Sequence, residues 1–496
     1  MNEQNNALPR EGQILCVLKP EVTRRDRLFL SLSFCYCFLL ADALHWPWGL
    51  GNTVTVFLWL LLLTAFLGPE TMFRRPESRV LLVVNLALAA SFALTSNFFF
   101  RWWNFLALLV LLPLHSLSVC GVLPWWNPAM LWERFLLLMW GLFGNLWASF
   151  ERPKASEQKV DPKRTLAVIM GACGGLALVS ILLPVLLSAD ALFAAAAENL
   201  RFAATWHFGD AFWRLLTACV LTPFLFGFLF SLRHPRPLKH SGTAARTDSL
   251  IFALMLAALD VLYLLFLGVQ SAGLFGGPEY LAGLGISYAE WARSGFFQMV
   301  GVTVVNLTLM LAALSFSRQE GRGWSGVRVL SAALSLESLI LLASAAWRMS
   351  LYVAAYGLSF KRCMTYWGMS MMALFFLAAL LKIRKPAFSF CRIAFPLALA
   401  GWLAINCVPI DWLTARNQVD RWLDGSSPSV SASYLLYDLS YQTIPQLERL
   451  DGSILVRIYD YGSEIPLSEM LQRRRDDALQ DCRDWRSWTL SAFLVS

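Results

Sequence analysis

The chain has 496 residues, of which 57% are hydrophobic and only 15% are charged. A water-soluble domain carries nearer a quarter of charged residues, so this composition excludes an ordinary soluble protein. The net charge of +8 does not indicate a nucleic-acid partner. From Asp411 onward there are 9 Lys and Arg against 13 Asp and Glu, so the basic excess lies earlier, largely in short loops, as expected for contact with membrane lipids.

The chain begins with a polar segment, residues 1–27, which we expect to be cytoplasmic because its arginines directly precede the first apolar run. Residues 28–410 then contain repeated apolar runs, each close to the ~20 residues that span ~30 Å of hydrocarbon. The runs predict an all-α, polytopic helical membrane bundle. They lie near residues 28–44, 51–68, 80–99, 104–123, 165–188, 211–232, 249–272, 295–316, 329–350, 364–381 and 393–411.

The run at 130–149 disturbs an otherwise regular alternation of basic and charge-poor loops. It is rich in tryptophan and carries Glu133 and Arg134, a composition that also suits a helix lying in the membrane interface. If it lies there, every basic loop falls on the cytoplasmic side. We therefore expect about eleven transmembrane helices, or twelve if 130–149 crosses, with the N-terminus cytoplasmic and the C-terminus extracytoplasmic.

The last part of the chain, residues 411–496, is polar but not of disordered composition. The stretch 454–459 (ILVRIY) has the composition of a strand. Apolar side chains from Leu467 to Trp485 recur at helical spacing. We expect a small, α-rich extracytoplasmic module, which could also contact an envelope protein partner.

Ionisable side chains inside the apolar runs are the strongest candidates for function. A charge at mid-bilayer costs at least ~2.5–3.5 kcal/mol and usually marks a partner or a site. Asp260 is the deepest acid, about twelve residues into its run, and Glu337 lies within another. Each could belong to an ion or substrate site or to a contact that fixes helix packing, and for Glu337 we favour packing.

A second group of polar residues falls near the expected outer ends of the helices. Arg348, Tyr352 and Tyr356 are four residues apart and share one helix face, so they could hold a carboxylate or an anionic headgroup. Arg348 could instead form an ion pair with an acidic side chain and so fix the packing of the helix bundle. The predicted substrate-binding set is Asp190, Asp260, Glu290, Arg293, Arg348, Tyr352 and Tyr356.

Signals for enzymatic chemistry are few. The five histidines do not stand at metal-ligand spacing, and no nucleophile elbow or phosphate-binding loop is present, so we expect no cofactor and no metal. Asp42 stands at the expected outer end of the first helix, a position that could serve a membrane enzyme acting on a lipid-linked substrate. Catalytic residues are not identified.

Distinctive segments lie at residues 188–193, 262–266, 274–277, 288–296, 344–352, 356–359, 411–417, 434–440 and 444–445. As a set they resemble a bacterial family of polytopic membrane proteins known as domain of unknown function 4173, with the related domain 4153. The resemblance covers roughly residues 165–450 and implies a bacterial cytoplasmic-membrane protein without an assigned activity. Asp260 departs from the family pattern, which has an amide there, and Gln442-Thr443 replace an acid–alanine pair.

The sequence leaves three functions open. The first is transport or handling of a small polar or lipid-linked molecule, based on Asp260 and the outer Arg–Tyr–carboxylate set. The second is a non-catalytic envelope sensor or scaffold that uses residues 411–496. The third is a membrane enzyme on a lipid-linked substrate.

Overall fold

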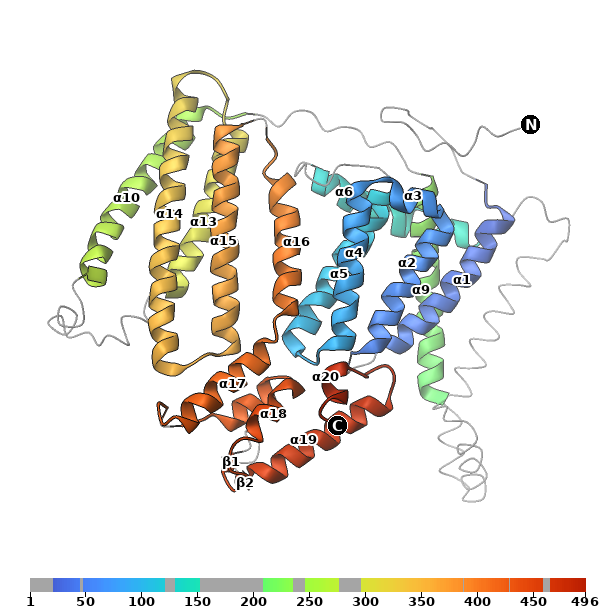
Figure 1. Ribbon diagram of the computed structural model, residues 1–496. Coiled ribbons are helices and arrows are strands. Elements are labelled where there is room, and N and C mark those ends of the chain that lie inside the picture. The colour runs from blue at the N-terminus through green and yellow to red at the C-terminus, as the bar shows by residue number, and fades with distance from the viewer. Residues whose placement is uncertain are drawn as a thin grey trace.

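A computed structural model describes residues 21–44, 48–120, 130–151, 208–234, 246–275, 296–386, 388–427, 429–457 and 464–496 (Figure 1). Nearly all of these residues are helical, and their only sheet is one pair of short strands. Eight of the described helices are long and apolar enough to cross a membrane, or nine if α16 and α17 form one bent span. The prediction of a multi-pass helical membrane protein is therefore confirmed.

The N-terminal bundle contains five long helices around one apolar core. Its largest fully buried side chains include Leu63, Phe66, Phe92, Phe226 and Phe230. A capping box starts the first helix, since Thr23 and Asp26 each accept a hydrogen bond from the other's backbone N–H. The helices are α1 (Arg24–Ala43), α2 (Leu50–Leu67), α4 (Pro76–Leu94), α5 (Phe98–Val119) and α9 (Phe208–Arg233), with the short α3 (Pro69–Arg74) between α2 and α4.

The second bundle contains α10 (Ser249–Phe275), α13 (Phe296–Phe316), α14 (Gly321–Tyr356) and α15 (Phe360–Arg384). Its core includes Leu256, Met310, Leu334 and Phe376. Large apolar side chains also point outward, as on α10, where Val269 is 76% exposed. Such a surface suits hydrocarbon rather than water, because a soluble monomer rarely shows an apolar patch of this extent.

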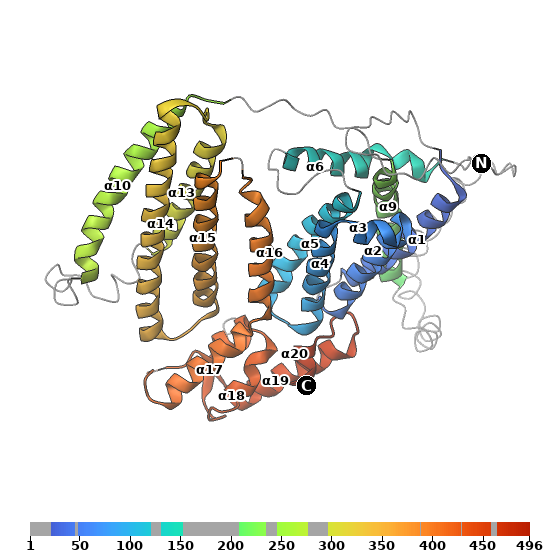
Figure 2. The ribbon, with the colours of Figure 1, turned by 45° about the horizontal axis from the view of Figure 1, so that its top comes forward.

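Helix α16 (Cys391–Cys407) stands between the two bundles in Figures 1 and 2. Its Trp402 indole N–H donates to Asn104 Oδ1 of α5 over 2.7 Å, and Asn104 Nδ2 donates to Asn406 Oδ1 over 2.7 Å. On the other side, the Trp367 indole of α15 donates to the Gly401 carbonyl over 2.9 Å. Polar bonds within apolar surroundings thus tie α16 to both bundles.

Ten of the eleven expected apolar runs are helices in the structure, and most boundaries fall within about six residues of those predicted. Helix α14 is the exception, because it extends beyond the predicted run 329–350 at both ends. The remaining run, 165–188, lies outside the described residues. The total of eleven crossings stays a prediction.

The segment 130–149 forms α6 (Met130–Met139), a short π-helical turn η1 (Trp140–Gly144) and a 3₁₀ turn η2 (Leu146–Ser149). In Figure 2 α6 runs crosswise over one end of the N-terminal bundle. The turns that follow contact the last part of α9, where Gly227 approaches Asn145. The Ser149 carbonyl accepts a hydrogen bond from Arg27 near the start of α1. The interfacial location of this segment stays a prediction, which the crosswise orientation supports.

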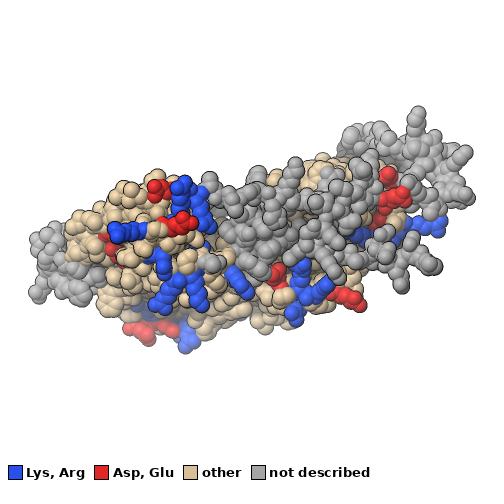
Figure 3. All heavy atoms as spheres, turned by 90° about the horizontal axis from the view of Figure 1, so that it is seen from above, with Lys and Arg blue, Asp and Glu red and all other residues tan. Residues whose placement is uncertain are grey.

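The end over which α6 lies also carries the basic loops that the structure describes, and we call it the basic face (Figure 3). Figure 3 looks onto this face and shows lysine and arginine side chains gathered there. They come from the α3–α4 turn, the α13–α14 turn and the α15–α16 connection: Arg74, Arg75, Arg79, Arg318, Arg322, Arg328, Lys382, Arg384, Lys385 and Arg392.

The tail, residues 410–496, covers the opposite ends of both bundles (Figure 1). It has its own apolar core, to which Leu435, Leu447 and Leu467 contribute fully buried side chains. The strands β1 (Leu455–Arg457) and β2 (Glu464–Pro466) pair antiparallel, with Val456 opposite Ile465. The helices are α17 (Ile410–Leu423), α18 (Ile444–Leu447), α19 (Leu467–Arg483) and α20 (Leu490–Phe493), with a π-helical turn at Tyr434–Asp438 and a 3₁₀ turn at Tyr441–Thr443.

Candidate functional site

A polar seam crosses the second bundle where α10, α13 and α14 meet. The Tyr263 hydroxyl donates to Asn306 Oδ1 over 2.8 Å, and Asn306 Nδ2 donates to Ser338 Oγ over 3.0 Å. These side chains come from three helices and are buried. Buried polar groups must find partners within the protein when neither water nor lipid can bond them, which explains the chain of bonds.

Two carboxyl groups lie beside this seam. Asp260 precedes Tyr263 by three residues on α10, and Glu337 directly precedes Ser338 on α14; each residue is only 5% exposed. Neither oxygen of Asp260 has a hydrogen-bond partner within the described residues, and Glu337 Oε2 has none there either. The Tyr263–Asn306–Ser338 chain of hydrogen bonds joins the helices that carry the two acids next to both of them.

Arg348, Tyr352 and Tyr356 occupy the end of α14 nearest the tail. Arg348 is 5% exposed, whereas Tyr356 is 53% exposed. The two tyrosine rings lie 4.9 Å apart, and the Arg362 guanidinium of α15 sits 4.3 Å over the Tyr352 ring. Arg362 also donates to the Tyr356 carbonyl over 3.1 Å. The sequence did not single out Arg362, which is brought to the tyrosines by the tight turn between α14 and α15.

Three further members of the predicted substrate-binding set, Asp190, Glu290 and Arg293, lie outside the described residues. The structure therefore places Asp260 and Glu337 on two helices that the Tyr263–Asn306–Ser338 chain joins, and it brings Tyr352 together with Tyr356. A ligand site shared by the whole set stays a prediction.

Asp42, the acid of the enzyme hypothesis, lies between two arginines. Its Oδ1 is 2.9 Å from Arg214 Nη1 of α9 and 2.9 Å from Arg486 Nη1 of the tail. Arg486 also binds Asp484, and its side-chain hydrogen bonds lower the pKa of the Asp484 carboxyl below its usual value. An acid held by two cations is poorly suited to proton transfer. In the described part of the chain this carboxylate contributes to the attachment of the tail.

Asp411 forms a second polar junction between the tail and the bundle. It is 3% exposed, and its Oδ2 accepts from Asn97 Nδ2 over 2.7 Å and from the Ser440 backbone N–H over 3.1 Å. Nearby, the Tyr441 hydroxyl donates to Asp481 Oδ2 over 2.9 Å. Burial raises the pKa of the Asp481 carboxyl above its usual value, although this hydrogen bond opposes the shift.

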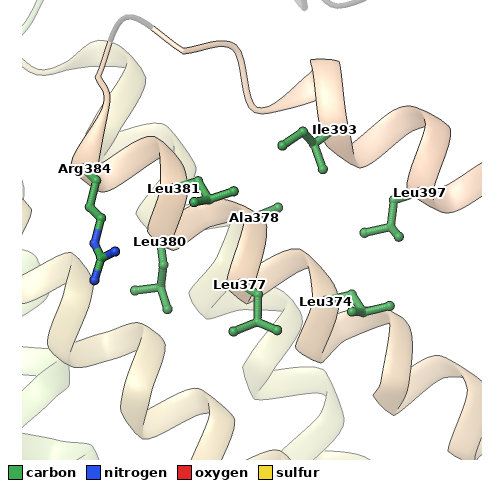
Figure 4. A pocket seen from close by; sticks show the side chains of 8 residues that line it. All are labelled: Leu374, Leu377, Ala378, Leu380, Leu381, Arg384, Ile393 and Leu397. Carbon is green, nitrogen blue, oxygen red and sulfur yellow. The ribbon is translucent and has the colours of Figure 1, made fainter.

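An apolar groove of about 450 Å³ opens between α15 and α16 in the half nearest the basic face (Figure 4). The sequence analysis did not identify it, because a groove depends on how far apart two helices stand. One arginine, Arg384, lies at its end among apolar side chains. The groove is lined by Leu374, Leu377, Ala378, Leu380, Leu381, Arg384, Ile393 and Leu397.

Comparison with known proteins identified one family. The model of a domain of unknown function, DUF4153, matches residues 82–450. A search of the curated proteins found no match, and a search of the solved structures found none. The matched range contains the second bundle, α16 and the first half of the tail.

Proposed function

The chain belongs to the DUF4153 family, whose description assigns no activity, and from the geometry we propose that it transports a small polar or lipid-linked molecule across its membrane. The polar seam of the second bundle is the proposed route of this activity. The predicted residues Asp260, Arg348, Tyr352 and Tyr356 all belong to that bundle, at its middle and at its tail end.

The observation that carries this proposal is the pair of buried acids, Asp260 and Glu337. A carboxyl group in the hydrocarbon region is costly, and chains keep it there mainly where it binds an ion, a proton or a substrate. A purely structural role would pair each acid with a donor, as the neighbouring Tyr263, Asn306 and Ser338 are paired. Asp260 has no such donor within the described residues.

The groove between α15 and α16 supports the lipid-linked form of the proposal. Leucine side chains line it, so it offers a surface to an acyl or prenyl chain. Arg384 at its end would then meet an anionic group attached to that chain. A lipid-linked molecule could reach this groove from within the membrane.

The proposed location is the bacterial cytoplasmic membrane, with the basic face inside. Short basic loops remain on the cytoplasmic side of such membranes, and the described basic loops gather on one face. This orientation leaves the tail outside.

The test uses the full chain reconstituted into liposomes, with two probes. Dithionite bleaching of fluorescent phosphatidylglycerol reports lipid movement between leaflets, and swelling in iso-osmotic amino acids or sugars reports passage of small solutes. We expect wild-type protein to be active in one assay, and Asp260→Asn and Arg348→Ala to lower that activity. Val261→Ala, on the exposed side of α10, is the matched control. Wild-type vesicles that behave like protein-free vesicles in both assays would refute the proposal.

A second candidate function is a scaffold at the outer face of the membrane. Large apolar side chains on the tail are exposed, among them Leu479, Trp485 and Leu494, and such groups are common in protein interfaces. If a partner binds there, Leu479→Ser should abolish a specific cross-link to that partner while the helical bundle stays folded. Equal cross-linking of the variant and the wild type would exclude this surface.

A further inference from the structure

The two buried acids lie near the middle of the hydrocarbon region. Glu337 follows Arg328 by nine residues and precedes Arg348 by eleven, and the 19 residues between these arginines contain no other charged side chain. At 1.5 Å per residue the two arginines are about 30 Å apart along α14, close to the thickness of the hydrocarbon. Arg328 marks one boundary, because its Nε donates to the Ile383 carbonyl at the basic end of α15.

Asp260 lies at a similar depth. Helices α10 and α14 start side by side, since a side chain at Gly323 would approach Ser249 Oγ to 2.5 Å. Asp260 follows Ser249 by eleven residues, and Glu337 follows Gly323 by fourteen. The two acids are therefore separated along the bundle by less than one helical turn.

Among the described residues, the helices packed around the pair offer no basic side chain at this depth. α13 contains no ionisable residue, and the basic residues of α15 lie in its first and last turns. On α14 the nearest cation to Glu337 along the axis is Arg328, about 14 Å away. On α10 the only other titratable side chain is Tyr263, whose hydroxyl hydrogen is donated to Asn306.

Two ionised carboxylates without a cation cannot persist at this position. Each would lose its hydration, and their mutual repulsion would be strong where the dielectric constant is low. A metal cation would need several more oxygen ligands around it. The surroundings instead include the apolar side chains of Leu256, Leu334 and Met310. A proton meets the requirement without further ligands.

We propose that Asp260 and Glu337 form a proton-binding pair within the membrane, which carries at least one exchangeable proton in the resting protein. Proton exchange at the pair would couple the movement of the transported molecule to the proton gradient. Only this coupling role rests on the proposed function. Proton binding itself follows from burial, from the unpartnered carboxyl oxygens and from the absence of a nearby cation among the described residues.

The experiment is labelling of the full chain, in liposomes, with dicyclohexylcarbodiimide. This apolar reagent enters the membrane and adds to a protonated carboxyl group, and the adduct rearranges to a stable acylurea that peptide mass spectrometry locates. We expect labelling at Asp260 or Glu337 that decreases as the pH is raised. Asp260→Asn and Glu337→Gln should each remove the label at their own position. Asp42, whose carboxyl is held in ion pairs with Arg214 and Arg486, is the internal control and should stay unlabelled.

Two results would overturn the proposal. One is the absence of label at both acids at low pH while the protein remains folded. The other is protection by sodium at constant pH, which would identify a sodium site instead. Labelling of the pair in a protein that fails both transport assays would leave the proton site standing and would refute only the proposed function.

Discussion

Removal of the Asp411 carboxylate is expected to loosen the tail far more than removal of the Asp42 carboxylate. Asp411→Ala leaves two buried donors, Asn97 Nδ2 and the Ser440 N–H, without their acceptor. Each hydrogen bond to a charged acceptor contributes about 1.5–3 kcal/mol to stability. The alanine variant no longer has to bury a charged group, and this gain offsets part of the lost hydrogen-bond energy. A net loss of about 2–4 kcal/mol in the free energy of tail opening follows.

Asp42 makes more ionic contacts, yet its effect should be smaller. Its side chain is 16% exposed and those of its partners Arg214 and Arg486 are 26% and 25% exposed, so water screens both pairs. Partly exposed ion pairs contribute about 0–1 kcal/mol each. We therefore expect Asp42→Ala to cost about 1 kcal/mol.

Hydrogen exchange of the tail amides in detergent micelles measures both changes. Local opening governs exchange, and about 1.4 kcal/mol corresponds to a tenfold change in its equilibrium constant. Asp411→Ala should speed exchange in α19 by roughly 30- to 700-fold, and Asp42→Ala by roughly fivefold. Asp424→Ala, at the exposed residue that directly follows α17, is the control. An effect of Asp42→Ala as large as that of Asp411→Ala would refute the argument that burial decides the magnitude.

Three further experiments test the tail and the packing of α16. Gly49→Ala should disturb docking of the tail, because the added Cβ would lie 2.5 Å from the backbone of Ser487. Gly51→Ala should have a milder effect, because its Cβ would lie 3.2 Å from the Arg486 Cα. Limited proteolysis of the C-terminus compares the two variants. Trp402→Phe removes the indole donor from Asn104 and should lower the free energy of unfolding by about 1–3 kcal/mol, measured by thermal unfolding with Trp367→Phe as a comparison. Burial raises the pKa of Asp481 in the folded state, so its contribution to tail stability is full below its unfolded pKa and is lost as the pH rises through the folded pKa. Asp481→Asn should remove this part of the pH dependence of hydrogen exchange in the tail. A pH dependence from acid to neutral pH that is the same in the variant and the wild type would count against this prediction.

The positions of the helices could be predicted from the sequence because each helix is determined by the residues within it. A run of about twenty apolar residues is sufficient to specify a membrane helix, whatever lies elsewhere in the chain. The positions of α2, α14 and α15 followed from such runs alone. The burial of Asp260 followed in the same way, from its place about halfway along an apolar run. Periodicity likewise located α19 in the tail.

The contacts at the helix ends could not be predicted, because they join distant parts of the chain. Asp42 and Arg486 are separated by 444 positions, and Asn97 and Asp411 by 314. An aspartate at the end of an apolar run has the same local pattern whether it is catalytic or ion-paired. The role of Asp42 became apparent only when the tail supplied Arg486. Arg362 likewise reached Tyr352 through a turn whose geometry the sequence does not encode locally.

Asp411 and Asp260 are both buried acids, but they differ in the donors that reach them. At the tail face, Asp411 Oδ2 accepts from two donors, although its Oδ1 has none among the described residues, and removing those donors would cost stability. At mid-membrane, Asp260 keeps two buried oxygens without a donor in the described structure, at a position where a charge is most expensive. Packing alone would favour a leucine there, since an apolar side chain of similar size avoids the cost. The acid is therefore better explained by the proton it can bind than by any contact it makes.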